Sequence, residues 1–179
     1  MITSCLILLA SFSSGEIAPS TDNFEELSNC IDSVPITMIE YLPYYVEFFE
    51  VENLEIAVRI GWCESRGKGT AYRKEDNDSG VMQFIPSTWN WIAEKNDLPR
   101  WDEWIILRYG QPYFGSLIKV EHDGMSAKKV QFVPYYNIMM ASILAEDTYS
   151  KTRWRDWNSS KWCWGDKEFY EKKWRAEGY

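Results

Sequence analysis

Apolar residues recur at helical spacing along most of the chain, and few segments alternate as a strand would. Residues 53–67 are apolar almost all round, with Asn53 suited to cap the start and Gly67 to end the helix in the left-handed conformation. Residues 134–149, opened by Pro134, form a second such segment. Because a helix that is apolar on every face is a buried helix, we predict a mainly α fold around two central helices.

The segments between and around these helices give weaker patterns. Apolar residues keep helical spacing across residues 39–49, but Pro43 predicts a kink or two short helices there. Pro86 suits the first turn of a further helix. We interpret residues 97–133 as an insertion, in which residues 101–107 fit a short helix and the remainder allows at most a small hairpin.

The chain starts with an apolar run, CLILLASF, followed by small residues, as in a secretory signal peptide. The run is too short to span a bilayer, so we expect no membrane span in the mature protein. No Lys or Arg precedes it, and a buried first helix or strand is the alternative. We therefore assign residues 1–20 to a candidate signal peptide, residues 21–35 to a linker and residues 36–179 to one domain.

Length and composition support that single domain. A chain of 179 residues with 45% hydrophobic and 16% aromatic residues fills one core and is not disordered. The net charge of -8 and the absence of clustered Lys and Arg exclude a nucleic-acid-binding protein. We expect a monomer.

The four cysteines indicate the compartment. If a signal peptide takes Cys5 with it, three cysteines remain, enough for one disulfide and a spare thiol in an exported protein. No Cys/His spacing suggests a metal, and His122 reads as a solvated loop residue, so we expect no metal and no cofactor. The expected location is outside the cell, in the periplasm or in the cell envelope.

Glu64 is the strongest candidate for a catalytic residue. It lies in the last turn of the first central helix, two residues after Trp62. Burial beside Trp62 and the negative end of the helix dipole would both raise the pKa of its carboxyl. A carboxylic acid of this kind is the proton donor that glycosidic bond cleavage needs near neutral pH. The alternative is a surface glutamate paired with Arg66.

The surroundings of Glu64 resemble the lysozyme-like superfamily, specifically the soluble lytic transglycosylase catalytic domain and the resuscitation-promoting-factor domain. A helix ends in CES, a polar loop follows, and then comes SGVMQFIPSTW, similar to the family pattern S-x-G-L-M-Q-(I/F)-x-P-x-T-(W/A). The resemblance covers residues 54–91 well and residues 134–165 loosely. It implies an α+β lysozyme-like fold, with the catalytic glutamate at the end of a buried helix.

The resemblance also implies roles for single residues. Glu64 would be the acid/base, Gln83 and Ile85 would lie on the floor of a glycan cleft, and Ser79 would lie at its edge. Asn137 begins a later helix that matches a similar element of the family. An amide such as Gln83 can donate to and accept from an N-acetyl group, although a structural amide that braces the loop is the alternative.

The cysteine before the catalytic glutamate bonds one near the C-terminus in the resuscitation-promoting-factor domain. The resemblance therefore implies a disulfide between Cys63 and Cys163 and leaves the partner of Cys30 open. That disulfide would hold the aromatic tail against the catalytic helix, where Trp157 could stack on a sugar ring or pack in the core.

One family feature is missing, because the A-Y-N-A-G segment of the larger lytic transglycosylases is absent. Its tyrosine approaches the catalytic glutamate, and Tyr136, Tyr149 and Trp157 are equal candidates for that role.

The resemblance implies a lytic transglycosylase that acts on peptidoglycan glycan strands. Glu64 alone would cleave the MurNAc–GlcNAc β-1,4 bond and leave 1,6-anhydro-MurNAc ends. A hydrolytic lysozyme that adds Asp76 or Asp78 as a second carboxylate is the first alternative, although turn formation is the commoner role of such loop residues. A non-catalytic glycan-binding module is the second alternative.

Overall fold

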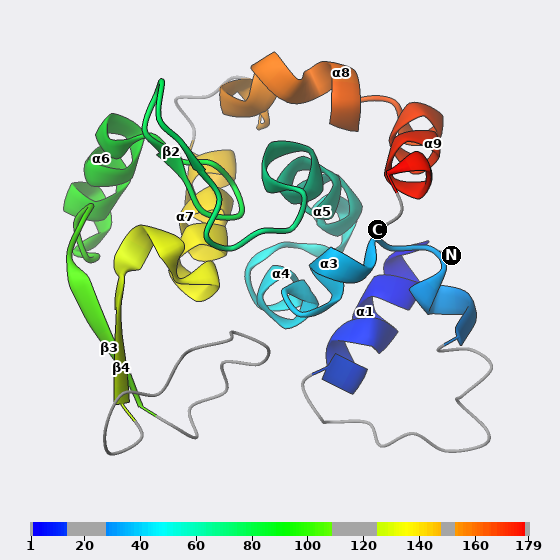
Figure 1. Ribbon diagram of the computed structural model, residues 1–179, viewed down its shortest axis with the longest axis horizontal. Coiled ribbons are helices and arrows are strands. Elements are labelled where there is room, and N and C mark those ends of the chain that lie inside the picture. Colours follow the sequence, from blue (N-terminus) through cyan, green and yellow to red (C-terminus); the bar gives the residue numbers. More distant parts are fainter. Residues whose placement is uncertain (1, 14–27, 109–124, 148–152, 178–179) are drawn as a thin grey trace.

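A computed structural model describes residues 2–13, 28–108, 125–147 and 153–177 of the protein. It confirms the mainly α fold, with helices gathered around α5 and two small antiparallel hairpins (Figure 1). The helices are α1 (Ile2–Ser13), α3 (Ile36–Ile39), α4 (Leu42–Phe48), α5 (Val51–Ser65), α6 (Pro86–Asn96), η1 (Val130–Phe132), α7 (Pro134–Glu146), η2 (Arg155–Ser160), α8 (Lys161–Trp164) and α9 (Lys167–Ala176). The strands are β1 (Tyr72–Arg73), β2 (Asp78–Ser79), β3 (Trp104–Arg108) and β4 (Met125–Lys129).

The ends of the central helix α5 differ from the prediction by three residues at the N-cap and by one residue at the left-handed C-terminal position. It starts after Glu50, whose backbone is extended, so the predicted cap Asn53 already lies inside the helix. It ends at Arg66, which adopts the left-handed conformation with φ 57°, one residue before Gly67 with φ 70°. The Arg66 guanidinium donates to the carbonyls of Trp62 and Cys63, two of the last-turn carbonyls that have no partner within the helix. The helix can therefore end at an arginine in the left-handed conformation, a position that glycine usually occupies.

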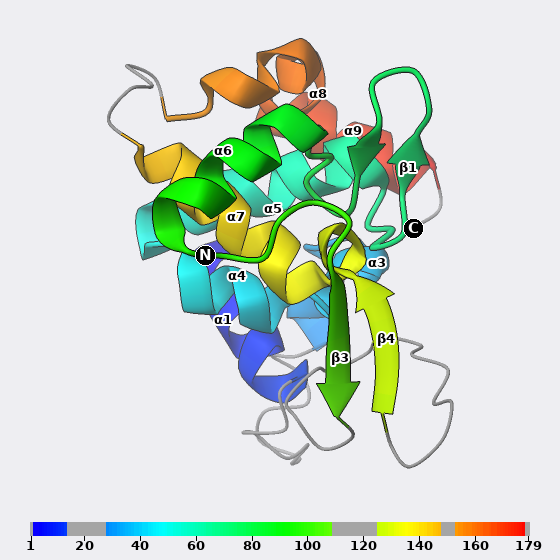
Figure 2. The ribbon, with the colours of Figure 1, turned by 90° about the vertical axis from the view of Figure 1, so that its left-hand side faces the viewer.

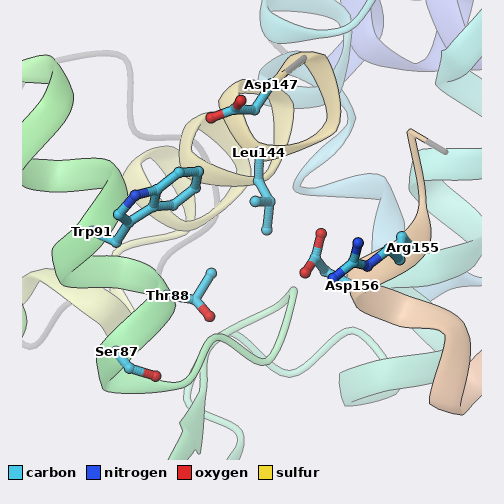
Figure 3. A pocket seen from close by; sticks show the side chains of 7 residues that line it. All are labelled: Ser87, Thr88, Trp91, Leu144, Asp147, Arg155 and Asp156. Carbon is cyan, nitrogen blue, oxygen red and sulfur yellow. The ribbon is translucent and has the colours of Figure 1, made fainter. Parts of the chain in front are cut away.

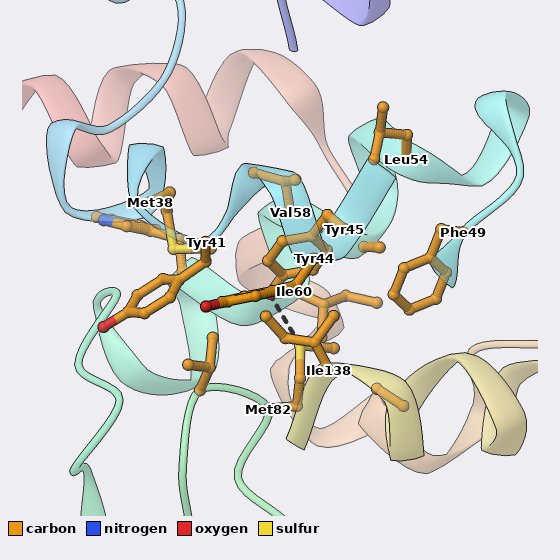
Figure 4. Packing of buried hydrophobic residues seen from close by; sticks show 14 of the residues in the cluster. Met38, Tyr41, Tyr44, Tyr45, Phe49, Leu54, Val58, Ile60, Met82 and Ile138 are labelled. Atoms are coloured by element: carbon orange, nitrogen blue, oxygen red, sulfur yellow. Dashed lines mark hydrogen bonds between the residues drawn. The ribbon is translucent and has the colours of Figure 1, made fainter. Parts of the chain in front are cut away.

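The core lies where α4 and α5 meet the loop before α6 and the start of α7 (Figure 4). Tyr45 of α4 is fully buried and its hydroxyl donates to the sulfur of Met82 at 3.1 Å. Gly61 of α5 faces that hydroxyl so closely that any side chain there would overlap it. The glycine therefore allows the two helices to approach, and the loop that carries Met82 rests on their contact.

The prolines act as predicted. Two short helices, α3 and α4, replace one long helix around Pro43, which lies in the first turn of α4. Pro86 and Pro134 each lie in the first turn of their helices, α6 and α7. The central position predicted for the second apolar helix is confirmed by the buried residues along α7.

The prediction of a short helix over residues 101–107 was wrong. Strands β3 and β4 pair from Trp104 opposite Lys129 to Arg108 opposite Met125, and their hairpin extends away from the helices (Figure 2). Trp104 and Ile106 are exposed while Ile105 packs on the core, which is the two-residue alternation of a strand. Because all three residues are apolar, the sequence hides this alternation.

The N-terminal apolar run forms helix α1, which packs against α4 and α5. Leu6 and Leu9 are buried, and Cys5 is bonded to Cys30, whose partner the sequence left open. The structure thus has the buried first helix that was the alternative to a signal peptide, and the Cys5–Cys30 disulfide belongs to the chain that retains this helix. Cleavage of residues 1–20 stays a prediction. None of the described helices is both long enough and apolar enough to cross a membrane.

Most aromatic residues of the tail pack on the core, whereas Trp162 and Phe169 are exposed. The disulfide between Cys63 and Cys163, which the resemblance implied, joins α5 to α8. Trp164, Tyr170 and Trp174 are buried behind it. Two disulfides are typical of proteins that fold in an oxidising compartment. The catalytic-helix candidate is thus covalently tied to the C-terminal segment.

Candidate functional site

A cleft of about 380 Å³ opens at the end of α5, and we call it the Glu64 cleft. The loop between α5 and α6 forms one side, and α6, α7 and η2 contribute the rest. Its lining residues are Glu64, Arg73, Asp76, Asp78, Met82, Gln83, Phe84, Ile85, Thr88, Leu144, Asp156, Trp157 and Ser159. The last turn of a buried helix therefore delivers a single glutamate to the wall of a concave, largely polar site.

The Glu64 carboxyl is half-buried, and its removal from water raises its pKa above the ordinary value. The nearby carboxylate of Asp78 acts in the same direction. The hydroxyl of Ser160 and the guanidinium groups of Arg73 and Arg66 act against it, but desolvation is the largest effect. The expected protonated carboxyl is thus favoured chiefly by burial, as a general acid requires.

Ser160 contacts Glu64 from the end of η2. Its hydroxyl lies near the Glu64 carboxyl, where donation to the ionised carboxylate lowers the pKa of Glu64. The same hydroxyl accepts from the indole nitrogen of Trp164 at 3.1 Å and lies 3.0 Å from the carbonyl of Trp157. A hydroxyl has one hydrogen, so the Glu64 carboxylate and the Trp157 carbonyl are alternative acceptors for it. Ser160 can therefore hold Glu64 in both protonation states.

Arg73 and Asp78 face Glu64 from the hairpin of β1 and β2, where they are directly paired. They form an ion pair, and the Asp78 side chain is only 4% exposed. Asp76 is more loosely paired with Arg73, at 3.8 Å. Both aspartates weighed as a second carboxylate thus line the cleft, and Asp78 is already engaged by a cation.

Gln83 lines the cleft, as the resemblance implied, but its amide nitrogen is used within the loop. It donates to the carbonyls of Gly80 at 2.8 Å and Ala71 at 3.3 Å. The Gln83 backbone is left-handed, with φ 51°, which is uncommon for a residue with a side chain. The bracing role is therefore present, and the amide oxygen is the part of Gln83 that is left for a ligand.

Ser79 and Asn137 do not line the cleft, contrary to the expectation that they bind substrate. Both are fully buried beneath it. The Asn137 amide accepts from the backbone nitrogen of Met82 at 2.7 Å and donates to the carbonyls of Ser79 and Gln131, both at 3.1 Å. A short polar side chain under a loop satisfies backbone groups that would otherwise be buried and unpaired. These residues support the cleft from below.

Ile85 and Trp157 do line the cleft. Ile85 is 37% exposed at the start of α6, where an apolar surface can meet a ligand. Trp157 is 4% exposed, and its indole nitrogen donates to the carbonyl of Met82 at 3.0 Å. Its main contacts are therefore with the core, including an edge-on contact with Phe84.

The candidates for the missing family tyrosine are not gathered at the cleft. Tyr136 packs edge-on against Tyr135 and does not line the cleft. Tyr149 and His122 lie outside the described residues. Trp157 is the one candidate of the three that the described structure brings to the cleft wall, and its indole nitrogen is already bonded.

A second hollow of about 390 Å³ adjoins the Glu64 cleft. The two share Thr88, Leu144 and Asp156, so they lie next to each other. Figure 3 shows side chains of α6 on one side of this hollow and of η2 on the other, with Leu144 of α7 between them. An extended ligand could therefore occupy both.

Sequence reasoning missed Arg73, Ser160 and Asp156. Arg73 lies in a polar loop and Asp156 in the aromatic tail, and no spacing connects either residue to Glu64. Ser160 had one signal, its place three residues before Cys163, which the resemblance joined to Cys63. Among the described residues, no group of three or more His, Cys, Asp or Glu side chains could hold a metal ion.

Comparison with known proteins adds no relative. No protein-family model matches the chain, and neither the curated proteins nor the solved structures contain a significant match. The assignment of function therefore depends on the chemistry of the site itself.

Proposed function

We propose that this protein is a lytic transglycosylase that cleaves the β-1,4 bond between MurNAc and GlcNAc in peptidoglycan glycan strands. The observation that carries the proposal is the Glu64 carboxyl, whose pKa is raised by burial, on the wall of a polar cleft. Two adjacent hollows suit neighbouring units of an extended polymer. Two disulfides fit a protein that works outside the cell, in the periplasm or the cell envelope.

The reaction proceeds in two steps with one carboxyl group. Glu64 donates its proton to the glycosidic oxygen of the leaving sugar while the N-acetyl carbonyl oxygen of MurNAc attacks C1. The bond from C1 to the leaving oxygen breaks, and Glu64 is left ionised. It then accepts the proton of the MurNAc 6-hydroxyl as that oxygen attacks C1 and releases the N-acetyl oxygen. The product is a 1,6-anhydro sugar, no water is consumed, and Glu64 ends protonated.

The surroundings of Glu64 suit this cycle. A carboxyl that serves as acid and then as base needs neighbours that tolerate both forms. The hydroxyl of Ser160 and the guanidinium of Arg73 stabilise the ionised form, while desolvation and Asp78 favour the protonated form. The amide oxygen of Gln83 is an acceptor for the N–H of the N-acetyl group that attacks C1.

A hydrolytic lysozyme is the second candidate, because carboxylates share the cleft with Glu64. Hydrolysis needs a second carboxylate to activate water or to act as nucleophile. Asp78 is engaged by Arg73 and almost unexposed, which disfavours it for either role. Asp156 is exposed and pairs with no described residue, so it is the group that would serve a hydrolase.

The test is the release of soluble muropeptides from purified sacculi by the wild type, by Glu64→Gln and by Glu94→Gln. Glu94 is an exposed glutamate of α6 that lines neither hollow. We expect Glu64→Gln to lower the rate by about 10²- to 10⁴-fold, since it removes the general acid, and Glu94→Gln to leave it unchanged.

The products separate the candidate functions. Mass spectrometry of the wild-type digest should find anhydro ends, whereas reducing ends would identify a hydrolase. Equal release by Glu64→Gln and the wild type would end the assignment of Glu64. If the wild type binds sacculi and releases nothing, the protein is a glycan-binding module.

A further inference from the structure

The second hollow has features that a neutral sugar chain does not require. It is lined by Ser87, Thr88, Trp91, Leu144, Asp147, Arg155 and Asp156. Its volume of about 390 Å³ is within the range of ligand sites, which is about 300 to 1,000 Å³. Leu144 and the 40% exposed ring of Trp91 give it apolar surface, and side chains of both charges surround that surface (Figure 3).

One wall of the hollow is already ordered. The ammonium of Lys95 lies 4.2 Å from the ring centre of Trp91 and 3.1 Å from the carboxylate of Asp147. These contacts join α6 to the end of α7 and fix the orientation of the indole. An aromatic side chain held in this way loses little conformational entropy when a ligand packs on it.

The facing wall carries charges that are available for a ligand. Arg155 and Asp156 of η2 are exposed and lie next to each other in Figure 3. Neither forms an ion pair with another described residue. Sugar hydroxyls and N-acetyl groups bring no charge to a guanidinium or a carboxylate. A ligand with a carboxylate, an amine and short aliphatic groups would match both charges and the apolar surface.

We propose that the second hollow binds the peptide stem that is attached to MurNAc, an inference that rests on the proposed function. The enzyme would then recognise the stem and the glycan strand together. The peptide stem has carboxylates that Arg155 can bind through paired hydrogen bonds. Its amine, where the stem contains a diamino acid, suits Asp156. Its methyl and methylene groups suit Leu144 and Trp91. A strand whose sugar lies at Glu64 passes the shared wall at Thr88, where its substituents reach the hollow.

The test measures binding in a Glu64→Gln background, so that no strand is cut. Glycan strands are immobilised in two forms, with stems intact and with stems removed by an amidase. The variants are Arg155→Gln and a matched control, Arg100→Gln, an exposed arginine that lines neither hollow. We expect Arg155→Gln to weaken binding to stem-bearing strands about tenfold, the effect of one charge-assisted contact of about 1.4 kcal/mol.

The same variant should bind stripped strands as well as its parent does, and Arg100→Gln should bind both forms as well as its parent. Equal weakening of Arg155→Gln on both forms would show that Arg155 contacts the sugars and would overturn the proposal. So would unchanged binding of Arg155→Gln to stem-bearing strands. If the parent binds neither form, the proposed function fails as well, whereas binding to both forms with no effect at Arg155 refutes the stem site alone.

Discussion

At the Glu64 carboxyl, desolvation and hydrogen bonding act in opposite directions. Burial favours the protonated acid, while the hydroxyl of Ser160 favours the carboxylate. A group that must give up a proton and then take one back works best when neither form is strongly preferred. The Ser160 hydroxyl accepts a hydrogen bond from the indole nitrogen of Trp164, and Ser160 lies three residues before the disulfide-bonded Cys163. The hydrogen bond and the disulfide together position Ser160.

Replacing Ser160 should move the titration of Glu64 in a defined direction. The hydroxyl lowers the pKa of Glu64 by stabilising the ionised form, so Ser160→Ala should raise that pKa. Since the first step needs protonated Glu64, the alkaline limb of the kcat/KM profile should move to higher pH. Ser160→Thr keeps the hydroxyl and should restore the wild-type profile.

Carbon-13 NMR of the glutamate side chains reports the Glu64 carboxyl directly, independent of activity. A Ser160→Ala protein whose Glu64 titrates at the wild-type pH would show that the hydroxyl does not act on the carboxyl. A pKa that falls would reverse its inferred role.

At the scale of elements, the Glu64 cleft depends on how the loop before α6 is attached to α7. The Asn137 side chain makes three hydrogen bonds there, to Met82, Ser79 and Gln131. All three hydrogen bonds are shielded from solvent, because Asn137 is fully buried. A helix residue therefore replaces the strand partners that this irregular loop lacks.

Asn137→Ala should destabilise the protein by about 2 to 3 kcal/mol, because it leaves the buried N–H of Met82 and the carbonyl of Gln131 without partners, while the Ser79 carbonyl keeps the N–H of Phe84. The control is Asn90→Ala, on α6, whose side chain accepts a single exposed hydrogen bond from the Trp101 backbone. It should cost less than about 1 kcal/mol. Urea denaturation at 25 °C measures both, and equal losses would show that the buried amide is not a support of the loop.

At the scale of the whole molecule, the two disulfides join distant segments to the same core. Cys63–Cys163 closes a loop of 100 residues and Cys5–Cys30 one of 25 residues. Only the first lies at the active-site candidate, since Cys63 precedes Glu64. We therefore expect the two bridges to differ in their effect on the site as well as on stability.

Replacing both cysteines of each pair by alanine tests this difference. The chain-entropy estimate is a loss of about 5 kcal/mol for Cys63–Cys163 and about 3.5 kcal/mol for Cys5–Cys30. The free energies of unfolding come from denaturant titration. Removal of the first bridge alone should shift the NMR titration of Glu64. A shift of the same size in both variants would mean that the Cys63–Cys163 bridge has no special role at the site.

Local sequence signals predicted the central helices and where α4, α6 and α7 begin. Pro43, Pro86 and Pro134 have a fixed φ and no N–H, which suits the first turn of a helix, and each lies in the first turn of its helix. The all-round apolar pattern identified α5 and α7 as central helices, and Glu64 follows from its place in the last turn of the first.

The hairpin of β3 and β4 could not be predicted in the same way. Trp104, Ile105 and Ile106 are all apolar, so the face that packs on the core is chosen by the pairing with β4 and not by the sequence pattern. The end of α5 at Arg66 is a similar case, because the guanidinium supplies bonds that the propensity of arginine does not reveal.

By itself the sequence determined the two central helices, the apolar surroundings of Glu64 and the chemistry that one buried carboxyl can perform, because these depend on neighbours along the chain. The tertiary structure decided which side chains surround that carboxyl. Arg73 reaches the cleft from β1 and Asp156 reaches it from η2, whose last residue, Ser160, acts on Glu64. Asn137 supports the cleft from below, through contacts between residues far apart in sequence. Long-range packing leaves no periodic signal, so only the folded chain shows it.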